Sequence, residues 1–267
     1  MSNIIAFVSI KGGVGKTTLA LEVASSLVNH FHKKVLLVDA NFSAPNIGLY
    51  LDLTNELTLH DALNGTPLHN VIYESYGIDI IPASMKYANP IDPFNLKKLL
   101  AKYKSRYDYI LIDSSPNYEE LKPVINTADR IFLITTPDHV TIETTLKAAE
   151  LAIEQKTPIE GIIVNRIRSP RHEYNLSQIE AYSQIPVVAK IKDNKKIARA
   201  LYRRTPITID SPNNNISKEI RRLASAIAGE PEIQNTFLQK LFTNNLIGKE
   251  KVNRVILRQK FYESQFT

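Results

Sequence analysis

The sequence predicts an α/β protein with a doubly wound, mostly parallel β-sheet and helices on both faces. Apolar runs alternate with segments of helical periodicity along most of the chain. Several of these runs are apolar on both faces, which is typical of buried parallel strands. A glycine-rich segment directly follows the first run, as in a tight strand-to-helix turn. With 267 residues, 43% of them hydrophobic, the chain is long enough for one large core.

In chain order, the apolar runs predict strands at 3–9, 34–39, 78–82, 107–113, 130–136, 160–165 and 185–191. Helical spacing predicts helices at 16–30, 94–104, 140–155, 193–203 and 216–228. These elements read as repeated β–α units, so ligands are expected at the carboxyl ends of the strands. The last helix should stop near Gly229, Glu230 and Pro231. We therefore expect one domain over 1–229 and a C-terminal helical extension over 230–267.

The glycine-rich segment 11–18, KGGVGKTT, follows the apolar run 4–8. Its glycines permit backbone conformations closed to residues with a Cβ, so successive N–H groups can turn toward a phosphate. The lysine of such a loop contacts the β- and γ-phosphates, and the hydroxyl that follows is a ligand for Mg²⁺. The segment therefore predicts a nucleoside triphosphate site. The expected contacts are Gly12, Gly13, Val14, Gly15, Lys16, Thr17 and Thr18.

Two aspartates end predicted strands at the same edge of the sheet as this segment. Asp39 follows the apolar run 35–38, and Asp113 follows 109–112. A carboxylate there can hold magnesium, usually through its waters, or orient the attacking water. Aspartate is also common in turns, so one alone would be weak evidence, whereas two beside the glycine-rich segment are stronger. We expect Thr17, Asp39 and Asp113 to form the Mg²⁺ site.

The segment departs from the common phosphate-loop pattern G-x-x-x-x-G-K-[ST]. Ile10 stands where that pattern has its first glycine, and Lys11 is an additional lysine. This deviant Walker A form resembles the MinD/ParA family of P-loop ATPases. The resemblance implies that ATP is the nucleotide and that ATP holds a homodimer together. It also implies that Lys11 reaches across the dimer to the partner's nucleotide.

The resemblance covers roughly residues 2–228. It includes a first switch segment, a Walker B strand, an adenine-binding strand end and a late strand and helix, at 35–48, 107–116, 162–166 and 185–198. The third of these implies that Asn165 and Arg166 bind the nucleotide. The stretch 58–63, with Tyr73 and 80–83, resembles the MinD branch, particularly its archaeal members, more than ParA.

The sequence departs from the family pattern at two places in the site. Asn41 stands where MinD proteins usually carry a second aspartate, and its amide can orient a water but cannot accept the proton of that water. The segment 115–118, Ser-Pro-Asn-Tyr, stands where the family usually has a glycine after the Walker B aspartate. A glycine there lets the backbone approach the γ-phosphate, so this departure concerns how tightly the second switch senses ATP. The catalytic residues that the resemblance implies are Lys11, Lys16, Asp39 and Asn41. From Asn41 alone, we expect an ATPase that is slow or depends on an activating protein partner.

Composition excludes several classes of site. The chain has no cysteine, which excludes disulfides, iron–sulfur clusters and thiolate zinc sites. The six histidines form no ligand pattern, so magnesium is the metal that we expect. No apolar run approaches the roughly 20 residues that cross a bilayer, and the first strand begins almost at Met1. We expect a cytoplasmic protein, with the inner face of the cell membrane as a peripheral location.

The formal charge of +6 and the pI near 9.3 indicate an anionic partner surface. Residues 249–266 place apolar side chains along one helical side and lysines and arginines around them, as in a helix that lies on an anionic membrane. MinD proteins of several lineages end in such a helix. The alternative is that this segment packs on the body of the protein or across a dimer.

Arginines provide a second interpretation of the charge. ParA-type partition ATPases bind DNA without sequence preference, and Arg203, Arg204, Arg221 and Arg222 are candidate phosphate contacts. The alternative is an ordinary solvated surface. Three hypotheses for function follow. The first is a MinD-like ATPase switch that positions cargo, such as the cell-division machinery, at a membrane. The second is ParA-like DNA partition, and the third is an ATP-gated scaffold without catalysis.

Overall fold

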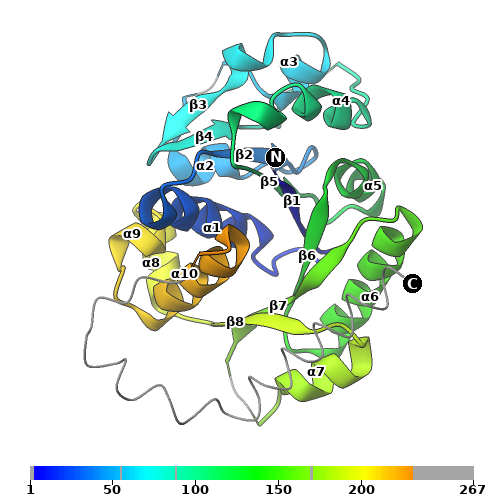
Figure 1. Cartoon of the computed structure of the whole chain (residues 1–267), viewed down its shortest axis with the longest axis vertical. Helices are drawn as coiled ribbons and strands as arrows, with labels where there is room; N and C mark the ends of the chain where they lie inside the picture. The colour runs from blue at the N-terminus through cyan, green and yellow to red at the C-terminus, as the bar shows by residue number, and fades with distance from the viewer. Residues whose placement is uncertain (1–2, 55, 88, 169–170, 231–267) are drawn as a thin grey trace.

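The computed structural model describes residues 3–54, 56–87, 89–168 and 171–230. Its centre is one eight-stranded sheet with the order β3-β4-β2-β5-β1-β6-β7-β8 (Figure 1). Neighbouring strands are parallel, except that β3 pairs antiparallel with β4. The strands are β1 (Asn3–Val8), β2 (Val35–Ala40), β3 (Tyr73–Ser75), β4 (Ile78–Ile81), β5 (Tyr109–Ser114), β6 (Arg130–Thr135), β7 (Ile159–Ile167) and β8 (Val187–Lys192). The predicted fold class is confirmed.

Helices cover both faces of this sheet (Figure 1). The helices of one face are α1 (Lys16–Phe31), α2 (Ile47–Leu51), α8 (Lys195–Tyr202), α9 (Ile207–Asp210) and α10 (Asn215–Ala228). The helices of the other face are α3 (Leu59–Leu63), α4 (Asn95–Ala101), α5 (Tyr118–Thr127), α6 (His139–Glu154) and α7 (Leu176–Ser183). Two short 3₁₀ helices, η1 (Leu68–Val71) and η2 (Lys104–Arg106), complete the description.

The two layers of helices account for the apolar strands. In β1, Ile5 and Phe7 pack with α1 and α10, whereas Ile4 and Ala6 pack with α5 and α6 on the other face. Successive side chains of a strand point to opposite faces, so a strand covered on both sides needs apolar residues at consecutive positions. β1 lies between β5 and β6, which places the segment that follows it at the middle of the sheet.

All seven predicted strands are present, with ends that differ by up to about two residues. β3 was not predicted, because it has only three residues and lies at the edge of the sheet. The helix predicted at 94–104 is shorter, since α4 ends at Ala101 and η2 follows it.

Four short helices, α2, α3, α7 and α9, were also not predicted. The longer helix α5 was not predicted either. α5 contains Pro123, which lacks an N–H group for the helix and so obscures the pattern. Local signals were nevertheless present. Asn117 caps α5 by accepting a hydrogen bond from the backbone of Glu119, and Asn175 and Gln178 form a capping box at the start of α7.

The last described helix ends where the sequence predicts. α10 ends at Ala228, and Gly229 adopts the left-handed conformation, with φ of 67°, that commonly ends a helix. The division into a domain and an extension stays a prediction, because residues 231–267 lie outside the described residues. The segment proposed to bind membranes, 249–266, belongs to that part. Among the described residues, no helix is both long and apolar enough to cross a membrane.

A buried carboxylate ties α1 to α9. Glu22 accepts hydrogen bonds from the backbone N–H groups of Ile207, at 2.6 Å, and Thr208, at 3.1 Å. The hydroxyl of Thr208 also donates to Glu22, at 3.0 Å. Burial raises the pKa of Glu22 to about 7, although these hydrogen bonds act in the opposite direction. Glu22 was not singled out in the sequence, because a glutamate in a helical pattern is usually a solvated residue.

Glu22→Gln is expected to remove a pH dependence of folding stability. Between pH 4.5 and about 7 the folded chain retains a proton on Glu22 that the unfolded chain releases. The contribution of Glu22 to the free energy of unfolding therefore falls as the pH rises through that window, by about 3 kcal/mol. Urea unfolding from pH 5 to pH 8 measures it. The difference in the free energy of unfolding between the natural chain and Glu22→Gln should change with pH. For the exposed control Glu150→Gln, the difference from the natural chain should stay constant.

Candidate nucleotide-binding site

The glycine-rich segment forms the predicted turn between β1 and α1. Gly13 and Gly15 have φ angles of 78° and 95°, which lie in the left-handed region that residues with a side chain rarely adopt. Gly15 is also held closely, because a Cβ at this position would lie 2.4 Å from Nδ2 of Asn165. The same Nδ2 donates to the carbonyl oxygen of Val14, at 2.7 Å. Asn165 at the end of β7 therefore braces the turn.

Gly15→Ala is expected to destabilise the nucleotide-free protein by about 2 kcal/mol and to weaken ATP binding. The added Cβ meets Asn165, and the backbone would be strained at a φ of 95°. Gly12→Ala is the matched control, because a Cβ there meets nothing within 4 Å and its φ is not in the left-handed region. Thermal unfolding without nucleotide compares the two variants. Equal losses would show that the brace by Asn165 does not matter.

Lys16 and Asp113 form the buried charged centre of the site. Both side chains are buried, Lys16 at the start of α1 and Asp113 at the end of β5. Burial lowers the pKa of Lys16, and the Asp113 carboxylate offsets part of that effect. Nζ of Lys16 lies 3.5 Å from the carbonyl oxygen of Lys11. The lysine ammonium is thus directed into the loop, where a phosphate would bring compensating negative charge.

The acidic residues of the site are close together. Asp39 and Asp113 are register partners on the neighbouring strands β2 and β5. Burial and the Asp39 carboxylate raise the pKa of Asp113, and the nearby Thr17 hydroxyl and Lys16 ammonium offset this in part. Neither carboxylate oxygen of Asp113 accepts a hydrogen bond of ordinary geometry from the described residues. Buried acceptors without partners are costly, so this pair of oxygens is suited to a ligand.

Magnesium fits the donors that are present here. Thr17 and Asp113 offer a hydroxyl and a carboxylate, the hard oxygen ligands that Mg²⁺ prefers, and the phosphates and waters would supply the remainder. Apart from the nearby Thr17 hydroxyl, no donor from the described residues satisfies the oxygens of Asp113, which agrees with an acceptor that meets a cation or its waters. When bound, the ion would be held by Thr17 and Asp113 and would neutralise negative charge on the phosphates.

Asp39 is engaged differently from Asp113. Its Oδ1 accepts the backbone N–H of Asn41 at 3.2 Å, and its Oδ2 accepts those of Asn46 and Ile47, both at 3.0 Å. Burial raises its pKa despite these bonds. In this conformation Asp39 thus fixes the backbone of 41–47 and the start of α2. The predicted role of Asp39 as a magnesium or catalytic residue stays a prediction.

Asn41 presents an acceptor in the buried site. Its Nδ2 donates to the carbonyl oxygen of Ala44, which also fixes the direction of its Oδ1. That Oδ1 is buried and has no hydrogen-bond partner among the described residues. An amide oxygen in this state can orient a water molecule without taking its proton.

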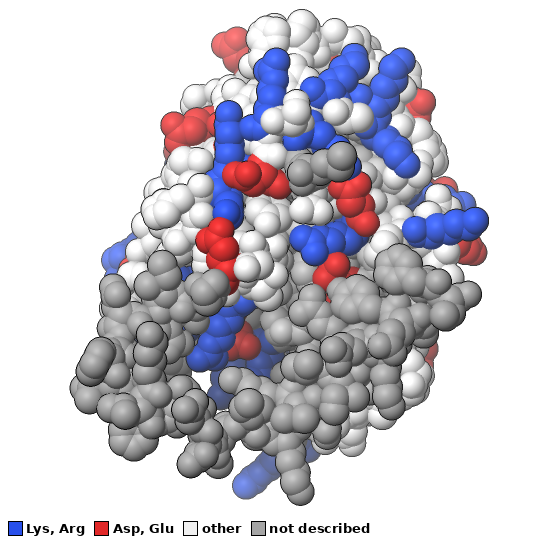
Figure 2. Space-filling model, viewed as in Figure 1, with Lys and Arg blue, Asp and Glu red and all other residues white. Residues whose placement is uncertain are grey.

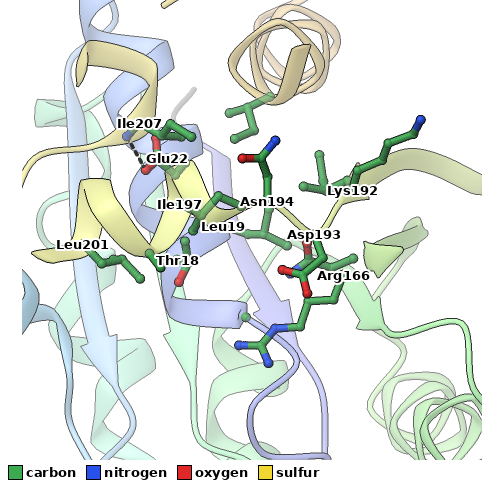
Figure 3. Close-up of a pocket in the computed structure, with 15 residues that line it drawn as sticks. Thr18, Leu19, Glu22, Arg166, Lys192, Asp193, Asn194, Ile197, Leu201 and Ile207 are labelled. Atoms are coloured by element: carbon green, nitrogen blue, oxygen red, sulfur yellow. Dashed lines mark hydrogen bonds between the residues drawn. The ribbon is translucent and has the colours of Figure 1, made fainter. Parts of the chain in front are cut away.

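A cavity of about 210 Å³ lies beside the start of α1 (Figure 3). Thr18 and Asn165 line it on the side of the glycine-rich segment, and Arg166 and Asp193 lie at the opposite end from Glu22. Arg166 has a φ of 56°, an unusual conformation for a residue with a side chain, at the end of β7. The mixture of apolar walls and a few polar groups suits a nucleotide base. The predicted base contacts Asn165 and Arg166 therefore lie together.

Several residues of this cavity were not among the predicted site residues. Asn194 and Ile197 come from the start of α8, and Glu22 and Ile207 close the far end. Asn194 and Ile197 could have been predicted from the sequence, because they follow β8 at the same edge of the sheet as the glycine-rich turn.

Lys11 lies outside this buried centre. Its side chain is exposed, in contrast to Lys16, and its ammonium makes no hydrogen bond or ion pair among the residues that the structure describes. Its backbone N–H donates to Oγ of Ser9 at 3.3 Å, which fixes the start of the turn. The structure thus separates the two lysines of the segment into one that faces the chain's own site and one that faces outward.

Known proteins resemble this chain over most of its length. The ParA family model, described as NUBPL iron-transfer P-loop NTPase, matches residues 1–228. An uncharacterized ATP-binding protein of Methanocaldococcus jannaschii is 29% identical over 86% of this chain and 89% of its own. The septum site-determining protein MinD of Bacillus subtilis is 27% identical over 86% of this chain and 90% of its own.

Solved structures agree with the sequence relatives. The septum site-determining protein MinD of Pyrococcus horikoshii, in complex with Mg-ADP, superposes with a TM-score of 0.80 at 26% identity, over 85% of this chain and 96% of that one. The family description mentions iron transfer, but this chain has no cysteine and therefore no thiolate ligand for iron. The phosphate turn, the strand-end acids and these matches together show that the chain belongs to the ParA/MinD family of P-loop NTPases.

Proposed function

We propose that this protein is an ATPase switch that binds ATP with Mg²⁺, forms a homodimer around the nucleotides and acts in spatial positioning at a membrane. The observation that carries the proposal is the opposite placement of the two lysines. Lys16 is buried beside Asp113, whereas Lys11 is exposed with no ion pair among the described residues. An outward lysine at the mouth of a phosphate site is suited to phosphates held by a second subunit. The septum site-determining relatives and the Mg-ADP complex support the same proposal.

Hydrolysis is proposed to be slow without an activating protein. The Asn41 amide can hold a water near the phosphates but cannot remove its proton, and loss of a general base costs roughly 10²- to 10⁴-fold in rate. The same residue supports the third hypothesis, a scaffold that binds ATP without turnover. Single-turnover hydrolysis by the purified chain separates the two, because a scaffold would leave bound ATP intact.

The arginines proposed as DNA contacts have partners within the chain. Arg203 pairs with Asp210 at 2.9 Å, Arg204 pairs with Asp52, and Arg222 pairs with Glu219 at 3.2 Å. Arg221 donates to the carbonyl oxygen of Pro212. These contacts neutralise or orient the guanidinium groups, which favours the membrane over DNA as the anionic surface. DNA binding stays the second candidate because exposed Lys195 and Lys196 have no ion pair among the described residues.

Sedimentation with a surface tests the proposal. The full chain is mixed with phosphatidylglycerol-containing vesicles or with plasmid DNA, each with ATP or with ADP. A truncation after Ile247 provides the comparison, because it removes 249–266. We expect vesicle binding that requires ATP and is lost on truncation. Salt-sensitive plasmid binding that survives truncation, without vesicle binding, would instead support DNA partition.

A further inference from the structure

The outer side of α4 combines an exposed aromatic side chain with unpaired lysines. Phe94, Lys98 and Lys102 follow one another at intervals of four residues, so they lie along one side of the helix. All three are exposed, and 54% of Phe94 is accessible. The opposite side carries Leu96 and Leu100, which are fully buried in the core. We call Phe94, Lys98 and Lys102 the α4 stripe.

The charge of the α4 stripe is not compensated locally. The ammonium groups of Lys98 and Lys102 make no hydrogen bond or ion pair with any of the described residues. Nearby cations do have partners, since Lys97 donates to Asn126 and Lys104 pairs with Asp129 at 2.7 Å. Lysine and arginine side chains gather at the end of the molecule where α3 and α4 lie (Figure 2). This end of the protein is therefore suited to an anionic surface.

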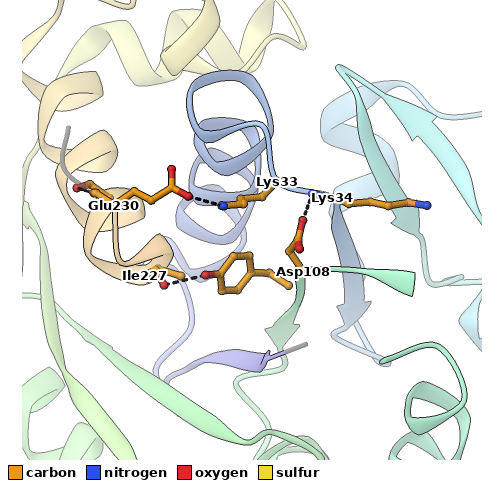
Figure 4. Close-up of polar contacts among 7 residues, drawn as sticks. Lys33, Lys34, Asp108, Ile227 and Glu230 are labelled. Atoms are coloured by element: carbon orange, nitrogen blue, oxygen red, sulfur yellow. Dashed lines mark hydrogen bonds and ion pairs between the residues drawn. The ribbon is translucent and has the colours of Figure 1, made fainter. Parts of the chain in front are cut away.

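The α4 stripe leads to the edge of the sheet where the described chain ends. η2 follows α4 directly and precedes β5, so Lys104 lies at the amino edge of the sheet. Lys104 and Lys33 line one polar hollow of about 450 Å³ at that edge. Glu230, the last described residue, pairs there with Lys33 at 2.5 Å, next to the start of β2 (Figure 4). The described chain therefore ends at the edge to which α4 leads.

We propose that the α4 stripe is a second contact with the anionic membrane, alongside the segment 249–266. The inference rests on the proposed membrane function. Membrane anchoring by one weak signal is marginal, and a basic patch on the body supplies the second signal that stable anchoring needs. Phe94 favours a membrane over nucleic acid, because an exposed aromatic ring beside lysines can enter the headgroup region, whereas phosphate contacts alone have no use for it.

Vesicle binding by full-length variants tests this contact. Vesicles of phosphatidylcholine with phosphatidylglycerol are compared with phosphatidylcholine alone, in the presence of ATP. Each lysine near an anionic surface contributes about 1 kcal/mol, so Lys98→Gln/Lys102→Gln should bind about 25-fold more weakly. Phe94→Ser should bind about fivefold more weakly. Lys147→Gln/Lys218→Gln is the matched control, because these exposed lysines lie on α6 and α10 and the change in charge is the same.

The outcomes separate the inference from the proposed function. Binding weakened by the α4 variants but not by the control supports the α4 stripe as a membrane contact. Binding by the natural chain that the α4 variants retain in full overturns the inference and leaves the membrane function standing. No ATP-dependent binding by the natural chain overturns both. Plasmid binding that the Lys98→Gln/Lys102→Gln variant loses, without loss of vesicle binding, overturns the inference and assigns the α4 stripe to nucleic acid. Unchanged ATP affinity and thermal stability check that the variants are folded.

Discussion

Lys11→Ala is expected to bind ATP as the natural chain does but to lose ATP-dependent dimerisation. Lys16 is buried and interacts with Asp113 in the proposed phosphate site of the same chain, whereas Lys11 is exposed. In the proposed dimer, the substitution removes a charge-assisted contact with the partner's phosphates. The loss of one such contact costs about 3 kcal/mol, and a symmetric dimer loses two, so the dimer should weaken by roughly 10⁴-fold.

Two measurements on the same samples separate binding from dimerisation. Titration calorimetry gives the affinity for ATP, and sedimentation velocity with ATP gives the fraction of dimer. Lys16→Ala is the comparison, because it should lose nucleotide binding and therefore also the dimer. A Lys11→Ala protein that dimerises normally would contradict the assignment of Lys11 to the partner's nucleotide. A Lys11→Ala protein that no longer binds ATP would show that Lys11 contacts the nucleotide of its own subunit.

The parts of the site that are local in sequence could be predicted. The phosphate turn depends on glycines, a lysine and a hydroxyl within eight residues, so the pattern alone identifies Gly15 and Lys16. Asp113 could be predicted from its place at the end of an apolar strand, because parallel strands end at one edge of the sheet. Most strands were predicted for the same reason, since each is a continuous apolar run.

The parts that depend on distant contacts could not be predicted. Asn165 braces Val14 across about 150 residues of sequence, and Glu22 caps a helix that begins about 185 residues later. The ion pair of Arg204 with Asp52 likewise joins two surface segments that no periodicity relates. Whether an arginine has a partner within the chain depends on such contacts, so composition alone could not distinguish paired from unpaired arginines.

Asn41→Asp is expected to raise the rate of ATP hydrolysis without an activator by about 100-fold. Oδ1 of Asn41 is a buried acceptor without a partner, so an introduced carboxylate would place a proton acceptor where the amide can only orient water. The substitution removes the hydrogen bond from Nδ2 to the carbonyl oxygen of Ala44. That oxygen still accepts from Asn46 at 2.8 Å, and the backbone bonds to Asp39 remain, so the segment stays in place. Phosphate release under single-turnover and steady-state conditions measures the change.

Asn46→Asp is the matched control for chemistry and charge. Asn46 also donates from its side chain to the carbonyl oxygen of Ala44, but Asn46 is only half-buried, whereas Asn41 is buried. Both substitutions therefore exchange the same hydrogen bond for a carboxylate, and only the one at position 41 puts it in the buried site. A rate that rises for Asn41→Asp alone identifies the position of the missing base. Equal rates for the two variants and the natural chain would contradict this prediction. Slow hydrolysis would then have another cause, such as the need for an activating group that a partner supplies.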